Sequence, residues 1–112
     1  MNEQVLSSRL MQVGKQVPLG ARLADIGSDH AYLPIYLVLK QQIPFAIAGE
    51  VVRGPYESAK KQVAKNGLEN QIIVRLADGL AAIHAEDQID AISIAGMGGT
   101  LIRNRLENGK QQ

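Results

Sequence analysis

Acidic side chains follow three successive apolar segments of this 112-residue sequence. Asp25 and Asp29 flank a glycine after the first segment, Glu50 ends the second, and Asp78 follows the third. Open α/β sheets bind ligands at the carboxyl ends of their parallel strands, so we expect these carboxylates to gather at one site. One such acid alone would be read as a helix cap or a solvated turn. Acids at three strand ends favour a ligand that carries several hydrogen-bond donors.

The turn after the first segment, Gly27-Ser28-Asp29-His30-Ala31, indicates the charge of that ligand. A dinucleotide-binding turn reads Gly-x-Gly-x-x-Gly, which lets bare backbone approach a pyrophosphate. Here Asp29 stands where the second glycine would fall, and a carboxylate a few Å from a phosphate costs about 1–4 kcal/mol. A cation such as S-adenosylmethionine, which has a sulfonium, an ammonium and no phosphate, suits the turn better. The alternative is that Asp25 and Asp29 only cap the following helix.

Two further acids fit the remaining parts of such a ligand. Glu50 follows Asp25 at close to the spacing of about 20 residues at which an acid on the second strand binds ribose hydroxyls. Asp78 could accept a hydrogen bond from an adenine amino group. An NAD-type oxidoreductase remains an alternative, because the same strand order and Glu50 would serve either ligand.

The composition limits the classes of function. Hydrophobic residues make up 46% and charged residues 21%, which is typical of a globular domain. The net charge of +1 gives no strong electrostatic case for nucleic acid or an anionic membrane. Without cysteine, and with two histidines, we expect no disulfide and no metal site. No signal peptide and no apolar run of about 20 residues is present, so we expect a cytoplasmic protein that does not bind membranes.

The apolar periodicity predicts a single domain over residues 1–112, with an N-terminal helix within 1–20 and β-α repeats over 21–112. Strands are expected over 22–27, 45–52, 72–76 and 89–95. Helices are expected over 32–40, 54–66 and 80–85, and in a last segment that carries Leu101, Ile102, Arg103, Arg105 and Leu106. This alternation is typical of an α/β fold with a Rossmann-like, doubly wound parallel sheet, here truncated after the fourth strand and its helix.

Four motifs, found together and in the same order, make the sequence similar to one known family. They are Leu23-Ala24-Asp25-Ile26-Gly27-Ser28-Asp29-His30-Ala31-Tyr32-Leu33-Pro34, Gly49-Glu50-Val51-Val52 with Gly54-Pro55, Arg75-Leu76-Ala77-Asp78-Gly79-Leu80, and Ile94-Ala95-Gly96-Met97-Gly98-Gly99. With these motifs the sequence resembles the bacterial TrmK family of tRNA (adenine-N1)-methyltransferases over nearly its whole length. The resemblance implies a class I methyltransferase that uses S-adenosylmethionine and acts on an adenine in the D-arm region of tRNA.

The resemblance also implies site residues. Asp25, Gly27 and Asp29 would line the methionine part of the cofactor, Glu50 would bind the ribose, and Asp78 would bind the adenine. The full set of expected cofactor contacts is Asp25, Gly27, Ser28, Asp29, Glu50, Val51, Asp78, Gly79, Ala95, Gly96 and Met97.

The fourth motif favours methylation of a ring nitrogen. Methyltransferases that modify an exocyclic amine commonly place Asn or Asp before Pro-Pro-aromatic there, whereas Gly96 to Gly99 offer no side-chain acceptor. Ring N1 of adenine already has an in-plane lone pair, so the enzyme mainly orients the base and stabilises the positive charge that develops. We expect Asp29 to act as the catalytic carboxylate. The same glycines could instead serve close backbone packing.

The expected substrate contacts are Gly98, Gly99, His30 and Tyr32, with the tyrosine stacking on a base. The alternatives are a locally hydrogen-bonded His30 at a helix start and a core role for Tyr32.

Family members continue into further strands and a helical C-terminal domain, whereas this sequence ends at Gln112. We therefore expect the cofactor-binding half, with tRNA as a partner of the whole enzyme and with weak or absent catalysis by these residues alone. A catalytically inactive interaction module is the remaining alternative. The fourth strand is expected to have an unpaired edge, through which the chain would self-associate.

Overall fold

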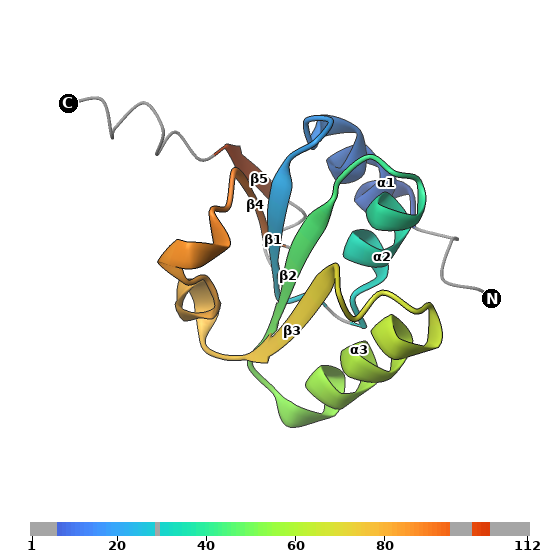
Figure 1. Ribbon diagram of the computed structural model, residues 1–112. Helices are drawn as coiled ribbons and strands as arrows, with labels where there is room; N and C mark the ends of the chain where they lie inside the picture. Colours follow the sequence, from blue (N-terminus) through green and yellow to red (C-terminus); the bar gives the residue numbers. More distant parts are fainter. Residues whose placement is uncertain (1–6, 29, 95–99, 104–112) are drawn as a thin grey trace.

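The computed structural model describes residues 7–28, 30–94 and 100–103 (Figure 1). The helices are α1 (Ser8–Gln16), α2 (Tyr32–Leu39) and α3 (Arg53–Lys65). The strands are β1 (Arg22–Ile26), β2 (Phe45–Glu50), β3 (Ile72–Leu76), β4 (Ala91–Ile94) and β5 (Thr100–Arg103). Two short 3-10 helices, η1 (Gly79–Ala82) and η2 (Ala85–Asp87), connect β3 to β4.

The strands form one sheet in the order β3-β2-β1-β4-β5. The first four strands are parallel and β5 runs antiparallel to β4. In this register Asp25 of β1 lies between Ala48 of β2 and Ser93 of β4, and Glu50 pairs with Leu76 at the end of β3. The predicted parallel, Rossmann-like α/β sheet is confirmed.

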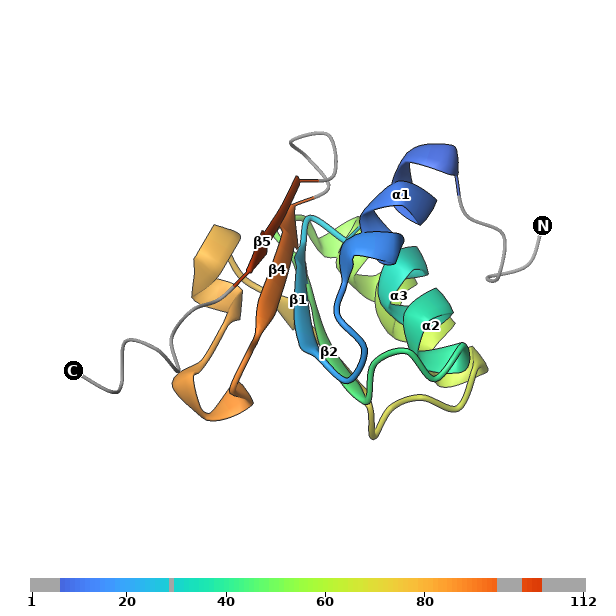
Figure 2. The same ribbon diagram turned by 90° about the horizontal axis from the view of Figure 1, so that it is seen from above.

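The two faces of the sheet are covered differently (Figure 2). All three α-helices lie on one face, where the larger apolar cluster joins strand residues such as Leu23 and Ala48 to Leu33 and Leu37 of α2. The segment η1–η2 lies on the other face, and its Ala82 packs in a smaller apolar cluster. Because successive strand residues point to opposite faces, Asp25 shares the helix-covered face with Leu23.

The N-terminal helix is anchored at both ends. The Ser7 hydroxyl caps α1 by accepting a hydrogen bond from the Leu10 N–H at 3.2 Å. At the other end the side-chain amide of Gln42 donates to the carbonyls of Gly14 at 2.9 Å and Val17 at 2.8 Å. The Gly14 carbonyl also accepts from the Val17 N–H at 3.1 Å, so the bonds from Gln42 add to the C-terminal cap and fix α1 to the loop after α2.

The prediction of a helix after the fourth strand is wrong for residues 100–103, which form β5. This strand pairs antiparallel with β4, from Thr100 opposite Ile94 to Arg103 opposite Ala91. Strand pairing satisfies the N–H and C=O groups along the edge of β4, and the β-branched Thr100 and Ile102 suit a strand. The expected unpaired edge of the fourth strand is therefore wrong as well, which removes the reason given for self-association. Arg105 and Leu106 lie outside the described residues.

The single helix expected over 80–85 is replaced by the two 3-10 helices η1 and η2. Over the described ranges, no helix is long and apolar enough to cross a membrane.

Candidate functional site

The turn after β1 is held against the end of β2. The N–H groups of Gly27 and Ser28 both donate to the carbonyl of Gly49, at 2.9 and 3.1 Å. Gly27 has a φ of 68°, a left-handed conformation that glycine adopts without a steric penalty. The turn therefore lies directly beside Glu50, which ends β2 and is 5% exposed.

Asp25 is a buried carboxylate at the centre of this edge. Its Oδ1 accepts a hydrogen bond from the Ser93 hydroxyl at 2.7 Å, and its Oδ2 has no hydrogen-bond partner within the described part of the chain. Burial raises the pKa of Asp25 to about 6; the hydrogen bond from Ser93 and the nearby hydroxyl of Ser28 act to lower this pKa, and the charge of Glu50 acts to raise it. The N-cap position of α2 is Ala31, with no side-chain capping bond, so a capping role for Asp25 is wrong.

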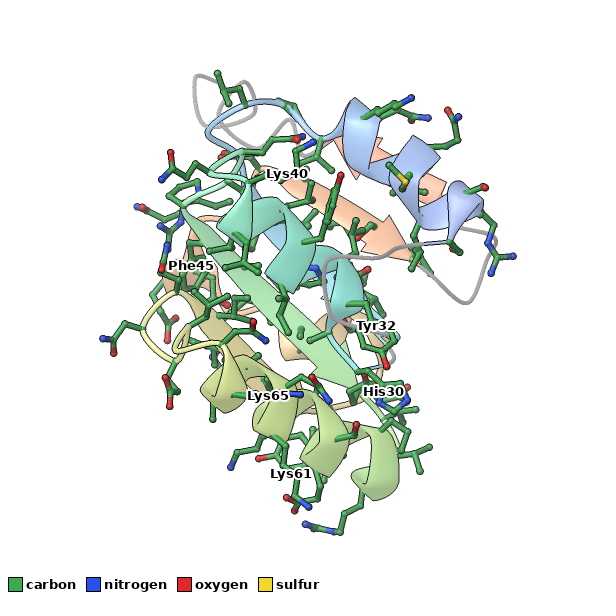
Figure 3. The ribbon with its side chains drawn as sticks, turned by 90° about the vertical axis from the view of Figure 1, so that its right-hand side faces the viewer. His30, Tyr32, Lys40, Phe45, Lys61 and Lys65 are labelled. Carbon is green, nitrogen blue, oxygen red and sulfur yellow. The ribbon has the colours of Figure 1, made fainter. Side chains whose placement is uncertain are left out.

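His30 and Tyr32 form a stacked aromatic pair beside the turn. Their ring centroids lie 5.2 Å apart with an interplanar angle of 24°, and Figure 3 shows both side chains at the carboxyl end of the sheet. The Nδ1 of His30 is hydrogen-bonded to the Ser58 hydroxyl of α3, which ties the pair to a second helix. His30 and Ala31 have φ values of 70° and 61°, and such left-handed backbone at non-glycine residues is concentrated at functional sites.

The end of β3 contributes a more open part of the site. The N–H of Ala77 donates to the Glu50 carbonyl at 2.8 Å, so the following Asp78 and Gly79 lie next to the end of β2. Asp78 is exposed, and so are two apolar neighbours of these acids, Val51 at 62% and Leu80 at 60%. This part of the edge is therefore open to solvent, in contrast to the buried Asp25 and Glu50.

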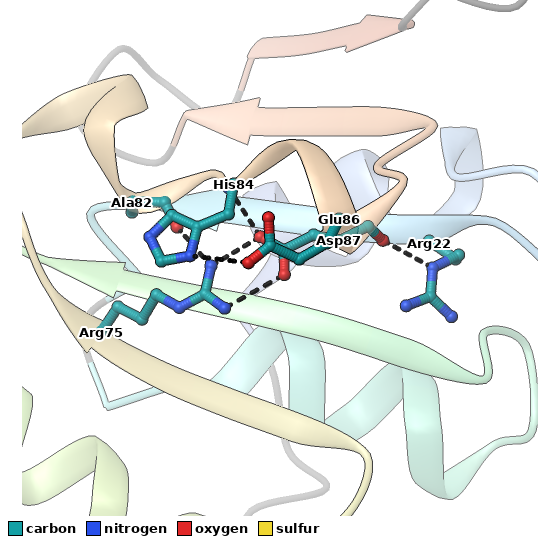
Figure 4. Close-up of polar contacts among 6 residues, drawn as sticks. All are labelled: Arg22, Arg75, Ala82, His84, Glu86 and Asp87. Atoms are coloured by element: carbon teal, nitrogen blue, oxygen red, sulfur yellow. Dashed lines mark hydrogen bonds and ion pairs between the residues drawn. The ribbon is translucent and has the colours of Figure 1, made fainter.

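An ion pair anchors the segment that follows Asp78 (Figure 4). The Arg75 guanidinium donates from Nη1 to Asp87 Oδ2 at 2.5 Å and from Nη2 to Asp87 Oδ1 at 3.0 Å. Arg75 also donates to the Ala82 carbonyl at 2.8 Å, and the His84 N–H donates to Asp87 at 2.7 Å. The hydrogen bonds from Arg75 lower the pKa of Asp87 most, and the bond from the His84 N–H adds to this. The η1–η2 segment is thereby fixed to β3.

Further contacts fix the same segment to the other strands. The Arg22 side chain of β1 donates from Nε to the Asp87 carbonyl at 2.7 Å, and its guanidinium lies over the Phe45 ring at 4.0 Å. Gly49 of β2 leaves room for η1, because a Cβ there would lie 3.0 Å from the Ala82 Cβ. The end of β2 and the start of η1 can therefore pack directly against each other.

The structure brings several predicted cofactor residues together at the ends of β1, β2 and β3, namely Asp25, Gly27, Ser28, Glu50, Val51, Asp78 and Gly79. The predicted contacts Asp29, Ala95, Gly96, Met97, Gly98 and Gly99 lie outside the described residues.

Sequence reasoning missed Ser93, Ser58 and the Arg75–Asp87 pair. Only Ser93 left a signal, as a polar residue between two isoleucines near the end of a strand. The described ranges contain no cluster of three or more histidine, aspartate or glutamate side chains that could hold a metal ion.

Comparisons of the sequence with known proteins identify its family. The sequence profile of TrmK, the tRNA (adenine(22)-N(1))-methyltransferase, matches residues 23–112. The tRNA (adenine(22)-N(1))-methyltransferase of Bacillus subtilis (strain 168) is 55% identical over 112 residues, which is 100% of this chain and 47% of the relative.

Similar solved structures include one complex with S-adenosyl-L-methionine and one with the cofactor product S-adenosyl-homocysteine. Streptococcus pneumoniae Sp1610, in complex with S-adenosyl-L-methionine, is 58% identical with a TM-score of 0.80, over 82% of this chain and 43% of that one. M. capricolum TrmK, in complex with S-adenosyl-homocysteine, is 42% identical with a TM-score of 0.74, over 80% of this chain and 40% of that one. The chain thus spans less than half the length of these relatives. With a family match over residues 23–112, the chain belongs to the TrmK family of tRNA (adenine(22)-N(1))-methyltransferases.

Proposed function

We propose that this chain is the S-adenosylmethionine-binding half of an enzyme that methylates ring N1 of an adenine in tRNA. The observation that carries the proposal is the pair of buried acids Asp25 and Glu50, which lie near the carboxyl ends of the adjacent parallel strands β1 and β2. The binding of S-adenosyl-L-methionine and S-adenosyl-homocysteine by two relatives supports placing the cofactor over this edge.

The donor groups of the cofactor match the acceptors at this edge. A buried carboxylate oxygen of Asp25 without a partner in the described chain suits the ammonium group. Glu50, on the neighbouring strand, suits the ribose hydroxyls, and Asp78 suits the adenine amino group. The exposed side chains of Val51 and Leu80 would be covered by the adenine ring. The residues present therefore fit the cofactor.

The cofactor, when bound, supplies an electrophilic methyl group on a cationic sulfur. The protein has to hold the base in line with that methyl group and to stabilise positive charge on the ring, because N1 carries its own lone pair. We propose Asp29 as the carboxylate that meets this charge. The stacked pair of His30 and Tyr32 offers an aromatic surface on which the base can be oriented, and Gly98 and Gly99 would let its edge approach.

The proposal separates cofactor binding from catalysis. This chain spans 47% of the Bacillus subtilis relative and 43% of the Streptococcus pneumoniae one, and we propose that the part of those proteins outside the match supplies surfaces that position tRNA. Since positioning is the main catalytic effect for an N1 target, we expect the 112-residue chain to bind the cofactor but to transfer the methyl group slowly.

Calorimetric titration of the chain with S-adenosylmethionine, S-adenosylhomocysteine and NADH tests which cofactor it binds. The first two are expected to bind and NADH is not; tighter binding of NADH would overturn the proposal in favour of a dinucleotide-binding domain. Methyl transfer from labelled cofactor to unmodified tRNA, with the Bacillus subtilis relative as positive control, tests the second part. Turnover equal to that of the relative would show that the half-enzyme description is wrong.

A further inference from the structure

Ser93 and Asp25 form a buried, hydrogen-bonded pair within the sheet. They are register partners on β4 and β1, 68 residues apart in sequence. Their side chains are 0% and 1% exposed, and the hydroxyl donates to Oδ1 at 2.7 Å. Both lie on the helix-covered face, where the neighbouring positions Leu23 and Ala91 are apolar.

Hydrophobic packing does not explain why a serine occupies this buried position. The residues on either side of it are isoleucines, and burying a hydroxyl in such a strand is unfavourable unless it finds an acceptor. Asp25 is that acceptor. Because the bond takes Oδ1, it restrains the rotation of the carboxylate and leaves Oδ2 as the oxygen without a partner in the described ranges.

We propose that Ser93 is a positioning residue for cofactor binding, which orients the Asp25 carboxylate so that Oδ2 receives the ammonium group of S-adenosylmethionine. The inference rests on the proposed function, since it assumes that Asp25 contacts the methionine part. It adds a residue of β4 that acts through Asp25 without touching the ligand itself.

The electrostatic surroundings of Asp25 give this role a second effect. Burial and the charge of Glu50 on β2 both raise the pKa of Asp25, whereas Ser93 on β4 and Ser28 in the turn lower it. A serine that donates to the carboxylate therefore favours the ionised form, which is the form that binds a cation. Removing the hydroxyl should disturb both the orientation and the ionisation of Asp25.

The test is the affinity of the 112-residue chain for S-adenosylhomocysteine, which keeps the ammonium group, measured by calorimetry between pH 5.5 and 8.5. We expect Ser93→Ala to weaken binding roughly tenfold at pH 7.5, as for a lost hydrogen bond to a charged group. The pH at which binding is half-maximal should also move upward. Ser93→Thr keeps the hydroxyl and should restore most of the affinity and the original pH midpoint.

Ile47→Val is the matched control, because Ile47 is fully buried on the opposite face of the sheet and belongs to the cluster that does not contain Ser93. It should lower the thermal midpoint without moving the pH midpoint of binding. If Ser93→Ala behaves in the same way as Ile47→Val, the serine is only structural and the inference is overturned.

Asp25→Asn distinguishes failure of the inference from failure of the proposed function. Absence of S-adenosylhomocysteine binding by the wild-type chain would overturn the proposed function, whereas unchanged affinity in Asp25→Asn would remove Asp25 from the cofactor site and overturn the inference alone. Weak binding by Asp25→Asn together with normal binding by Ser93→Ala would overturn the positioning role alone.

Discussion

The guanidinium of Arg75 in β3 holds the carboxylate of Asp87 in η2 through two hydrogen bonds, 2.5 and 3.0 Å long. The side chains are only 18% and 4% exposed, so this pair is shielded from water far more than a surface ion pair. The pair attaches the η1–η2 segment, which follows Asp78, to β3 on one face of the sheet. The Ser93–Asp25 bond acts on the opposite face, so the two ends of the proposed cofactor site have separate supports.

Replacing Asp87 by Asn should destabilise the fold by about 2–3 kcal/mol, because a half-buried guanidinium loses its charged partner. Chemical denaturation measures this directly. Glu57→Gln is the control, since Glu57 pairs with Arg53 on the exposed face of α3 at 3.6 Å and should cost less than about 1 kcal/mol. Equal losses in the two variants would show that the Arg75–Asp87 pair contributes no more than a surface contact.

The same pair predicts acid sensitivity. The pKa of Asp87 is held below its ordinary value of 3.8, mainly by the hydrogen bonds from Arg75. Its stabilising contribution is therefore fully present above about pH 4 and is lost as the pH falls through the lowered pKa. Chemical denaturation at several pH values below 4 should show that the free energy of unfolding falls in the wild-type chain and falls less in Asp87→Asn.

Asp25→Asn should stabilise the fold while weakening cofactor binding. The pKa of Asp25 is raised from 3.8 to about 6, so the folded chain holds its proton more tightly than the unfolded chain. Stability is therefore lost as the pH rises from about 4 to 6, by up to about 3 kcal/mol. Denaturation curves of the variant should lack this decline. A variant less stable than wild type at pH 7.5 would contradict the prediction.

Gly49→Ala should displace η1 and weaken binding at the adenine end of the site. The new Cβ would lie 3.0 Å from the Ala82 Cβ, closer than carbon atoms normally approach, and overpacking of this kind costs about 1–3 kcal/mol. Gly54→Ala is the matched control, because the added methyl group would meet no atom within 4 Å beyond the adjacent residues and nearby backbone of α3, and the site is in the first turn of that helix. Thermal denaturation should show a loss for the first variant and none for the second.

Glu50→Gln should weaken binding of S-adenosylhomocysteine by about 1–3 kcal/mol, as expected when a charged acceptor of ribose hydroxyls is lost. Calorimetry at pH 7.5 measures the change, with Glu57→Gln as a control for the loss of one negative charge. If Glu50→Gln binds like the control, Glu50 does not contact the ribose.

The sequence by itself determined the alternation of strands and helices and the edge at which the acids meet. Apolar runs such as 45–52 and 72–76 are local signals, and they contain β2 and β3. Parallel strands share one carboxyl edge, so acids at their ends were expected along that edge once the sheet was recognised. The location of Asp25 and Glu50 at this edge therefore follows from the sequence alone.

The tertiary structure decided which side chains touch. Ser93 reaches Asp25 across 68 residues and His30 reaches Ser58 across 28, contacts that depend on sheet order, register and helix placement. Residues 100–103 were expected to belong to a helix, yet they form β5 because pairing satisfies the backbone of β4, a gain that only the assembled edge offers. Local patterns specify elements, whereas partners distant in sequence are specified only when the elements pack together.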